Sequence, residues 1–276
     1  GTGKIYTKGL DVSGWQDINL NFNKIKAAGY SYVILRAGTT KGKDTNFETF
    51  YKNAKAAGLH VGAYYYSYAL TVSEAKADAD DFLSYIAGKT YEYPLYFDFE
   101  DPTQITLDYT LQKNICLAFM DKIAAKGYLT GMYTGKYHAS LLDMNTICAK
   151  YESWIAHYLR SSGDGTNDWT TYGYTYSTQF GMYQYTANCY VSGLSGYYDA
   201  DLCYKDYPSI VKKYGFNGYS PEGGSGSDSG GSDSGDSGGT ETGTYFDECT
   251  FYPSHVEIKV KTATQLYTEP RSNGTS

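Results

Sequence analysis

Eight short runs of apolar and aromatic residues recur between residues 9 and 214, and their regular spacing limits the folds that the chain can adopt. The runs are 9–12, 32–37, 60–66, 94–100, 129–134, 153–158, 181–185 and 198–202. Helical patterns that end in glycine separate several of them, as at 22–29, 47–58 and 115–127. Strand, helix and glycine repeated in this order predict an α/β fold with a parallel sheet, and eight strands in about 200 residues predict a compact (β/α) barrel. Residues 163–178 show no helical pattern, so we expect an irregular barrel with loops among its later connections.

A change of composition after Gly215 divides the chain. Residues 222–244 repeat Gly, Ser and Asp, with five acids and no Lys or Arg, and are predicted to be a flexible linker. Most of the net charge of −7 is concentrated there, so the body before it lacks the basic surface that nucleic-acid binding needs. We expect residues 1–221 to form the barrel and 245–276 to begin a truncated β domain. Alternation at 256–260 is typical of a strand, but 32 residues are too few for a core.

Features that report on the cellular compartment are few. A membrane-spanning helix needs about 18 consecutive apolar residues, and the sequence contains no such run. The opening residues 1–4 are typical of a chain whose leader has been removed, so we expect a secreted, extracellular protein. Export would permit a disulfide between Cys189 and Cys203, whereas buried free thiols are an equally good expectation for Cys116 and Cys148. With Cys249, the five cysteines lack CxxC spacing and nearby histidines, which argues against a zinc site.

Acidic residues fall where the strands of such a barrel meet its active end. In a barrel of parallel strands, the C-terminal ends carry the active site. The fourth run ends in Asp98 and Glu100, whose i,i+2 spacing places both carboxyls on one face of the strand. The first run carries Asp11 and the last carries Asp199, and closure of the barrel sets these two runs side by side. We therefore expect four carboxyls to converge on one site.

Clustered carboxyls favour the chemistry of glycosidic cleavage. Carboxylates that lie together repel one another, so at least one of them should keep its proton near neutral pH. A protonated carboxyl can then donate to the leaving oxygen while an ionised neighbour stabilises positive charge on the sugar. Metal binding is the alternative, but the acids lack the short Asp-x-Asp-x-Asp spacing of calcium loops, and the histidines show no ligand partner. We expect neither a metal nor another cofactor.

Aromatic and polar side chains near the strand ends are candidate sugar contacts. The chain contains 33 Tyr against 11 Phe and 3 Trp, and sugar rings stack their C–H faces on such rings. The expected substrate contacts are Tyr64, Tyr66, Tyr133, Trp154, Tyr158, Gln184 and Tyr185. Barrel packing is the alternative role for each aromatic residue. Arg36, at the end of the second run, is expected to pair either with an active-site acid or in a structural ion pair.

Five segments resemble motifs of glycoside hydrolase family 25, the Chalaropsis-type lysozymes. They are 9–16 (GLDVSGWQ), 96–100 (YFDFE), 153–158 (SWIAHY), 182–185 (MYQY) and 196–201 (GYYDAD). The resemblance implies an irregular (β/α) barrel that cleaves the β-1,4 bond between N-acetylmuramic acid and N-acetylglucosamine in bacterial peptidoglycan. It also implies Glu100 as the acid, with Asp98, Asp11 and Asp199 around it. Many members carry Asn where Asp201 stands, so this chain adds a fifth carboxyl, and we expect Asp201 among the substrate contacts.

Two mechanisms are compatible with these residues. In one, the N-acetyl group of the substrate attacks the sugar carbon, Asp98 stabilises the product of that attack, and Glu100 acts as acid and then as base. In the other, Asp98 or a neighbour activates water and the configuration inverts. Adjacent Asp and Glu on one strand favour the first mechanism, by analogy with substrate-assisted hydrolases.

Two other functions are weighed against a lysozyme. A chitinase of family 18 also uses Asp-x-Glu, but it requires another acid two residues upstream, where this chain has Tyr96. A non-catalytic wall-binding module gains nothing from clustered acids. Residues 262–270 resemble the start of a bacterial SH3-like module, which often binds cell wall. We expect a monomer whose partner is peptidoglycan.

Overall fold

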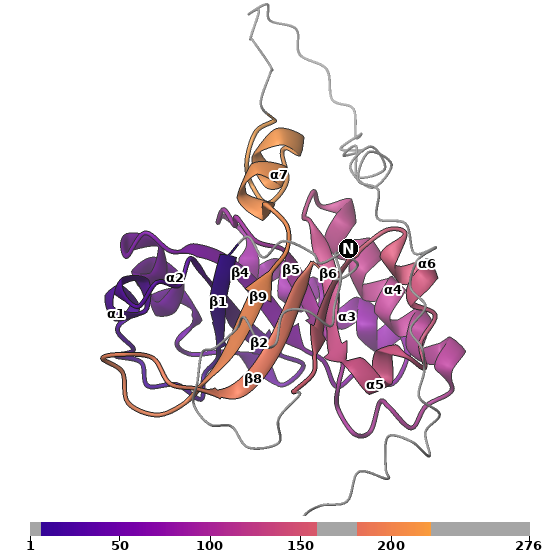
Figure 1. Ribbon diagram of the computed structural model, residues 1–276. Helices are drawn as coiled ribbons and strands as arrows, with labels where there is room; N and C mark the ends of the chain where they lie inside the picture. Colours follow the sequence, from indigo (N-terminus) through magenta and orange to yellow (C-terminus); the bar gives the residue numbers. More distant parts are fainter. Residues whose placement is uncertain (1–6, 159–180, 222–276) are drawn as a thin grey trace, which may run out of the picture.

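The computed structural model describes residues 7–158 and 181–221, in which eight strands of one sheet close into a barrel (Figure 1). The barrel strands are β1 (Thr7–Val12), β2 (Tyr32–Thr39), β4 (His60–Tyr66), β5 (Leu95–Asp98), β6 (Thr130–Gly135), β7 (Glu152–Ala156), β8 (Met182–Cys189) and β9 (Tyr198–Cys203). Each of the eight predicted runs is a strand. The barrel closes because β1 pairs with both β2 and β9, while the two-residue β3 (Gly42–Lys43) forms a hairpin with the end of β2.

The last strand runs against the others. The pairings among the barrel strands β1, β2, β4, β5, β6, β7 and β8 are all parallel, whereas β9 is antiparallel to both β8 and β1. The expectation of a parallel sheet is therefore wrong for β9. Residues 190–197 join β8 to β9, and this connection is too short for the crossover of a dozen or more residues that a parallel pair needs. As a consequence, Asp199 lies at the beginning of its strand and still reaches the barrel end where the other strands finish.

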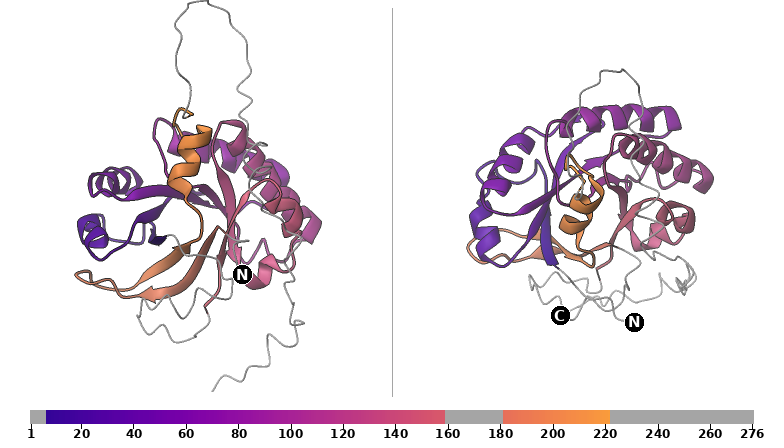
Figure 2. Two further views of the ribbon diagram at one scale, coloured as in Figure 1. Left: turned by 45° about the horizontal axis from the view of Figure 1, so that its top comes forward. Right: turned by 90° about the horizontal axis from the view of Figure 1, so that it is seen from above.

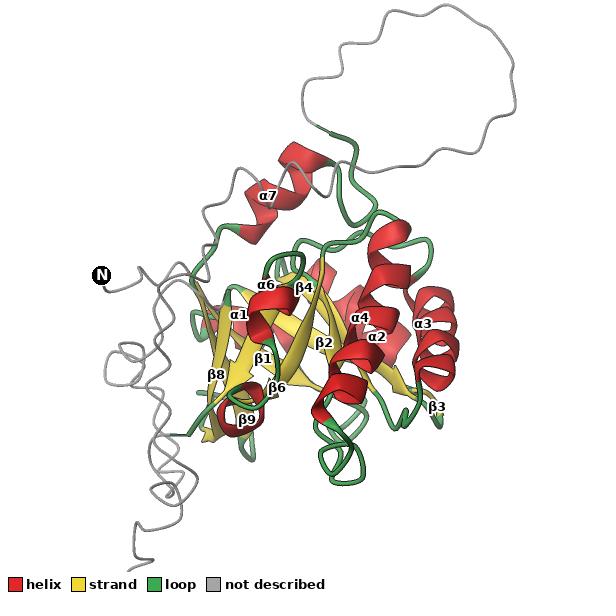
Figure 3. Ribbon diagram, turned by 90° about the vertical axis from the view of Figure 1, so that its right-hand side faces the viewer, coloured by secondary structure: helices red, strands yellow, loops and turns green. Residues whose placement is uncertain are grey.

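Helices cover the outside of the barrel along most of its circumference (Figures 2 and 3). They are α1 (Phe22–Ala27), α2 (Phe47–Ala56), α3 (Val72–Ile86), α4 (Tyr109–Ala125), α5 (Lys136–Ala139) and α6 (Met144–Cys148). Gly29 (φ +94°) and Gly58 (φ +79°) adopt the left-handed conformation after α1 and α2, which confirms the predicted glycine stops. A seventh helix, α7 (Tyr207–Tyr214), lies over the barrel end at which the parallel strands begin (Figure 2).

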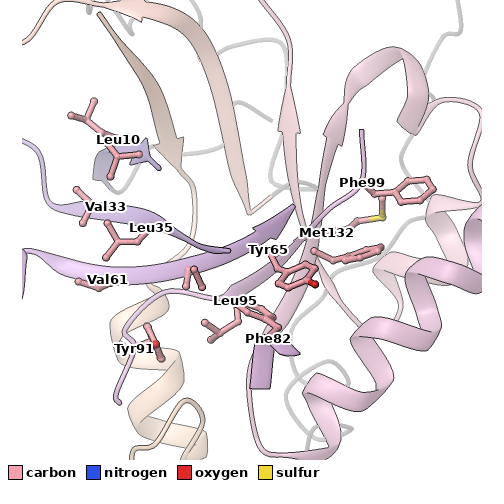
Figure 4. Packing of buried hydrophobic residues seen from close by; sticks show 14 of the residues in the cluster. Leu10, Val33, Leu35, Val61, Tyr65, Phe82, Tyr91, Leu95, Phe99 and Met132 are labelled. Atoms are coloured by element: carbon pink, nitrogen blue, oxygen red, sulfur yellow. The ribbon is translucent and has the colours of Figure 1, made fainter. Parts of the chain in front are cut away.

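The main hydrophobic core lies between the strands and the helices. Outward-facing strand residues such as Leu10, Val33 and Met132 are fully or almost fully buried there (Figure 4). Phe97 of β5 and Phe99 just after the strand take this outer side, and Phe97 stacks on Phe119 of α4 at 4.2 Å between ring centroids. Burying an aromatic or aliphatic side chain contributes about 1.5–3 kcal/mol. This outer packing fixes the inner face of each strand, and Asp98 accordingly points into the barrel.

Tyrosine and glycine fill the interior of the barrel. Tyr32 and Tyr96 are fully buried there, and a Cβ atom built on Gly9 would lie 2.3 Å from the Tyr32 ring. Near α7, the buried Glu152 accepts hydrogen bonds from Lys205 Nζ at 2.9 Å and from the Tyr207 hydroxyl at 2.7 Å. Part of the tyrosine excess therefore serves packing. The interior is a filled core rather than a channel, as is usual in such barrels.

The four cysteines in the described residues are buried free thiols, so the disulfide that export would permit between Cys189 and Cys203 is not formed. In the β8–β9 ladder Cys189 lies opposite Tyr198 and Cys203 lies opposite Met182. The two cysteines are thus at opposite ends of the ladder, roughly 20 Å apart at the usual rise per strand residue.

In the described part of the chain, none of the helices has the length and apolar character needed to cross a membrane. The predicted loops at 163–178, Cys249, the linker at 222–244 and the β fragment at 245–276 lie outside the described residues.

Candidate active site

The carboxyls of Asp11, Asp98, Glu100 and Asp199 lie together at the end of the barrel opposite α7. Asp98 is the last residue of β5, and Asp11 faces Asp199 in the β1–β9 ladder. Electrostatic interactions link Asp98 with Glu100 and Asp11, and link Asp199 with Asp11 and Glu100. The expected convergence of these residues, separated widely in sequence, is confirmed as geometry.

Asp98 and Glu100 form a closely coupled pair. Their carboxyls interact as hydrogen-bond partners, with Asp98 buried and Glu100 exposed to solvent. Burial raises the pKa of Asp98 well above its usual value, the negative charge of Glu100 adds to this, and Arg36 opposes it. The pKa of Glu100 is also raised, by partial removal from water and then by Asp101. The pair therefore retains a proton at a pH where isolated carboxyls have lost theirs.

Asp11 and Asp199 continue the cluster on the neighbouring strands. Burial raises the pKa of Asp199 to about 9, and the adjacent Asp11 adds to that shift. The pKa of Asp11 is raised as well, first by burial and then by Asp201. Several of these carboxyls are thus neutral at physiological pH, and the cluster carries less negative charge than its composition implies.

Gln184 holds Asp11 in place. Its Nε2 donates to Asp11 Oδ2 at 2.7 Å, and its Oε1 accepts hydrogen bonds from the hydroxyls of Tyr133 and Tyr158, both at 2.6 Å. Two hydroxyl donors on one side and a carboxyl acceptor on the other define the orientation of the amide. Gln184 is buried, so we reassign it from the expected sugar contact to the positioning of Asp11.

Trp154 and Asp201 lie below the acids and do not reach solvent. The buried Trp154 indole packs against Tyr64, Tyr96 and Tyr133, and its Nε1 donates to Asp201 Oδ1 at 2.8 Å. Asp201 faces Gly9 in the β1–β9 ladder, two residues deeper than the Asp11–Asp199 pair. Both side chains belong to the floor of the site, and their roles as substrate contacts stay predictions.

Tyr185 lies away from the acids, and its role as a substrate contact stays a prediction. It is 1% exposed and packs in the outer core, where it interacts with Tyr30 and Cys189. Strand side chains alternate between faces, so the inward position of Gln184 sends Tyr185 outward.

The other tyrosines lie near the acids. Tyr64 is almost buried and interacts electrostatically with Asp11 and Asp98. The hydroxyl of the partly exposed Tyr66 donates to Asp101 Oδ2 at 3.1 Å. Tyr158 is 44% exposed and therefore offers ring surface to a ligand. Tyr64, Tyr66, Tyr133 and Tyr158 remain predicted contacts, with Tyr66 and Tyr158 the most accessible of them.

Arg36 pairs with Asp44, a partner that the sequence did not indicate. Arg36 Nε donates to Asp44 Oδ2 at 2.8 Å, and the backbone N–H of Gly14 donates to the same oxygen at 2.7 Å. The structural ion pair is thus the correct alternative, although the charge of Arg36 still lowers the pKa of Asp98. Asn46 Nδ2 binds Ser13 O at 3.1 Å, so the loop carrying the exposed Trp15 is anchored from two sides.

Within residues 7–158 and 181–221, no group of three His, Cys, Asp or Glu side chains is arranged to hold a metal ion. Carboxyls that share protons and hydrogen bonds are instead suited to acid–base chemistry.

A family model of glycosyl hydrolases family 25 matches residues 10–194, more than half of the chain. The chain belongs to glycosyl hydrolase family 25. Its relatives include the autolytic lysozyme of Clostridium acetobutylicum, 27% identical over 70% of this chain and 55% of that protein. Lysozyme M1 of Streptomyces globisporus is 27% identical over 68% of this chain and 65% of its own length. The chain therefore spans somewhat more than half the length of these relatives.

Solved structures agree with this assignment. The bacterial lysozyme from Streptomyces coelicolor superposes with a TM-score of 0.58 at 27% identity, covering 71% of this chain and 90% of that one. The CTP1L endolysin superposes with a TM-score of 0.59 at 26% identity, covering 76% of this chain and 70% of that one. The irregular barrel expected from the sequence is the fold of this family 25 chain.

Proposed function

We propose that this family 25 chain is a muramidase that hydrolyses the β-1,4 bond between N-acetylmuramic acid and N-acetylglucosamine in bacterial peptidoglycan. The observation that carries the proposal is the coupled pair of buried Asp98 and exposed Glu100, surrounded by further carboxyls with raised pKa values. Glycosidic cleavage needs one carboxyl that is protonated and accessible, and a second beside it. The lysozymes among the relatives support the same activity.

Glu100 is the accessible member of the pair and acts as the general acid. Its raised pKa keeps a proton available for the leaving oxygen of the glycosidic bond. Once that proton has been transferred, the Glu100 carboxylate can accept a proton from the attacking water. Both roles need exposure to solvent, which the buried Asp98 lacks.

Asp98 stabilises an intermediate formed by the substrate itself. Among the described residues its Oδ1 has no hydrogen-bond partner, so this oxygen can accept the N–H of a substrate acetamido group. As that N–H is fixed, the acetamido oxygen attacks the sugar carbon, and the negative charge of Asp98 offsets the positive charge that develops. Release of the proton of the Asp98–Glu100 pair to the leaving group provides that charge.

The closeness of the pair supports substrate assistance over inversion. An inverting pair of carboxyls stands about 6.5–9.5 Å apart to leave room for water, whereas Asp98 and Glu100 interact as direct hydrogen-bond partners. Proton NMR of the first product distinguishes the two routes. Retained configuration at the new reducing end is expected, and an inverted anomer would eliminate the substrate-assisted route.

The activity is tested by the release of reducing ends from purified bacterial walls. Wild type should release muramic acid ends, and Glu100→Gln should reduce the rate by at least about 10²-fold. Glu48→Gln is a matched control, because Glu48 is exposed on α2 and pairs with Lys43 and Lys89 far from the acids. Cleavage of chitin oligomers without cleavage of walls would reject the muramidase in favour of a chitinase. Wall binding without cleavage would favour a binding module.

The location of the substrate leads to two related proposals. We propose that the protein acts outside the cell, since peptidoglycan lies there.

We also propose that residues 245–276 belong to a wall-binding module tethered by the linker at 222–244. Pull-down of walls by the full chain and by a chain ending at residue 221 would test the second proposal, with equal binding counting against it.

A further inference from the structure

We propose that Thr134 is a positioning residue for Glu100, and that His138 controls it by gaining or losing one proton. The kinetic part of this inference rests on the proposed function, in which Glu100 is the general acid. Thr134 and His138 are buried and act through the backbone that leads to Glu100.

The Thr134 hydroxyl holds the peptide group that precedes Glu100. β5 ends at Asp98, so the residues that follow no longer belong to the strand. The backbone N–H of Phe99 donates to Tyr133 O at 3.0 Å, and the Phe99 carbonyl oxygen accepts the hydroxyl of Thr134 at 3.0 Å. In the described part of the chain no backbone N–H donates to this carbonyl, so the Thr134 side chain supplies its hydrogen bond. Since the carbonyl belongs to the peptide between Phe99 and Glu100, the bond fixes the direction in which the Glu100 side chain leaves the backbone.

Three buried side chains connect this peptide to α4. His138 Nδ1 lies 3.0 Å from Thr134 Oγ1, and His138 Nε2 is a hydrogen-bond partner of Gln112 Oε1. Gln112 Nε2 donates to Leu107 O at 2.7 Å. The Phe99 ring also stacks on the imidazole, with 5.6 Å between ring centroids. The series from Gln112 through His138 to Thr134 therefore joins α4 and α5 to the backbone behind the general acid.

These contacts need one more hydrogen than a neutral imidazole provides. Leu107 O can only accept, so it takes the NH₂ of Gln112 and leaves Oε1 to face His138 Nε2, which must carry a hydrogen. Phe99 O can also only accept, and it uses the single hydrogen of the Thr134 hydroxyl. The contact between Thr134 Oγ1 and His138 Nδ1 then requires a hydrogen on Nδ1 as well. The arrangement is therefore that of a charged imidazolium.

Loss of the Nδ1 proton redirects the Thr134 hydroxyl. Without its proton Nδ1 is an acceptor, and the hydroxyl has one hydrogen for Nδ1 and Phe99 O together. An imidazole nitrogen is a stronger base than a peptide oxygen, so the hydroxyl turns to Nδ1 and Phe99 O loses its donor. The peptide before Glu100 can then rotate, and the alignment of Glu100 with Asp98 loosens.

Burial determines the direction in which this change moves along the pH scale. The hydrogen-bonding and stacking partners of His138 among the described residues are Gln112, Thr134 and Phe99, which are uncharged. From the elements packed around His138, the nearest ionisable groups in sequence are Glu100 after β5, Lys113 on α4, Tyr133 on β6, Lys136 and Tyr137 on α5, and His157 after β7. Removal from water lowers the pKa of His138 below its usual value. The charged form, and with it the bond from Thr134 to Phe99, is therefore favoured at acidic pH.

Thr130 provides a matched control for Thr134. It lies four residues earlier on β6, and its buried hydroxyl donates to Leu95 O of β5 at 2.6 Å. The two threonines thus bind the same neighbouring segment, one behind the acids and one at the far end of the barrel. Valine at either position keeps the branched shape and removes one buried hydroxyl donor, so the two variants should lose similar stability. Thr134→Ser keeps the hydroxyl.

The kinetic test measures kcat and KM on solubilised glycan strands below and above the pH at which His138 changes its charge. Below it, Thr134→Val should lower kcat by about tenfold with KM changed by less than about twofold, while Thr130→Val and Thr134→Ser should stay within about twofold of wild type. Above it, wild type has itself lost the bond, so Thr134→Val should differ from wild type by less than about twofold. Equal losses of kcat in the two valine variants would overturn the positioning role, and a deficit that does not change with pH would overturn the control by His138.

An NMR measurement without substrate separates this inference from the proposed function. The nitrogen signals of the His138 ring should show hydrogens on both nitrogens at acidic pH and on Nε2 alone at higher pH. The carbonyl carbon signal of Phe99 should move with the same midpoint in wild type and much less in Thr134→Val. These signals support the inference even if walls are not cleaved. A His138 ring that never carries two hydrogens, a ring that keeps its hydrogen on Nδ1 at higher pH, or a Phe99 carbonyl that does not respond would each overturn it.

Discussion

The Nε2 atom of Gln184 lies 2.7 Å from Asp11 Oδ2 and links β8 to β1 across the active end of the barrel. Because two tyrosine hydroxyls bind the other end of the amide, Asp11 is oriented by a chain of groups that starts at the partly exposed Tyr158. The site is thus built from linked side chains rather than from independent acids.

Gln184→Leu should impair turnover more than substrate binding. The substitution removes the N–H that holds Asp11 and leaves the Tyr133 hydroxyl buried without its acceptor, which costs about 1–3 kcal/mol of stability. We expect kcat to fall by roughly tenfold while KM changes by less than about twofold. Steady-state kinetics measure both values. Tyr158→Phe, which removes one of the two hydroxyl donors, should have a smaller effect, and a rise in KM alone for Gln184→Leu would contradict this role.

Asp199→Asn should stabilise the fold at alkaline pH. A carboxyl whose pKa is raised on folding binds its proton more tightly in the native state, so its contribution to stability falls as pH rises between the unfolded and folded pKa values. For Asp199 this window runs from about 4 to about 9. Thermal unfolding at about pH 8 should show a gain of several degrees over wild type, and the gain should vanish near pH 4. An equal gain at both pH values would mean that the charge of Asp199 is not responsible.

Arg36→Met should move the acid limb of the rate profile to higher pH. The guanidinium opposes the upward shift of the Asp98 pKa, so without it Asp98 loses its proton at higher pH. The measurement is kcat/KM as a function of pH. Asp44→Asn is the control, because it releases the loop at Gly14 but keeps the positive charge. A similar shift in that variant would assign the effect to the loop instead.

Lys205→Met should destabilise the barrel strongly without altering its chemistry. The substitution removes the cation beside the fully buried Glu152 at the end of the barrel far from the acids. Leaving one charge of a buried pair costs about 3–5 kcal/mol, whereas removing both charges costs less. Urea denaturation should therefore find Lys205→Met less stable than the double variant Glu152→Leu/Lys205→Met. The reverse order would show that Glu152 is stabilised mainly by Tyr207 and other neighbours.

Much of the architecture follows from local sequence patterns. The alternation of inward and outward side chains in each strand, with the glycine after each helix, predicts the eight strands. Because active sites of such barrels lie at the C-terminal ends of the strands, Asp11, Asp98 and Glu100 are then expected to lie together. The prediction puts Asp199 at the correct barrel end although it gives β9 the wrong direction, because Asp199 faces Asp11 at the start of the reversed strand. The short connection at 190–197 is the signal that could have predicted the reversal.

The remaining errors arise from information that a single strand does not contain. Whether Gln184 or Tyr185 faces inward depends on the register of β8 with its neighbours, which alternation alone does not fix. The depth of Asp201 depends on the direction of β9. Asp44 lies just after the two-residue β3, which is too short to recognise as a strand, so its pairing with Arg36 was not foreseen.

The contact between Gly9 and the Tyr32 ring limits how a barrel of this kind can be redesigned. Since the space beside Gly9 is already filled by the Tyr32 ring of the next strand, a residue can grow at position 9 only if its neighbour shrinks. Changes beneath the acids must therefore come as matched exchanges between strands. A designer seeking a different substrate would do better to leave this floor intact and vary the loops at the open end.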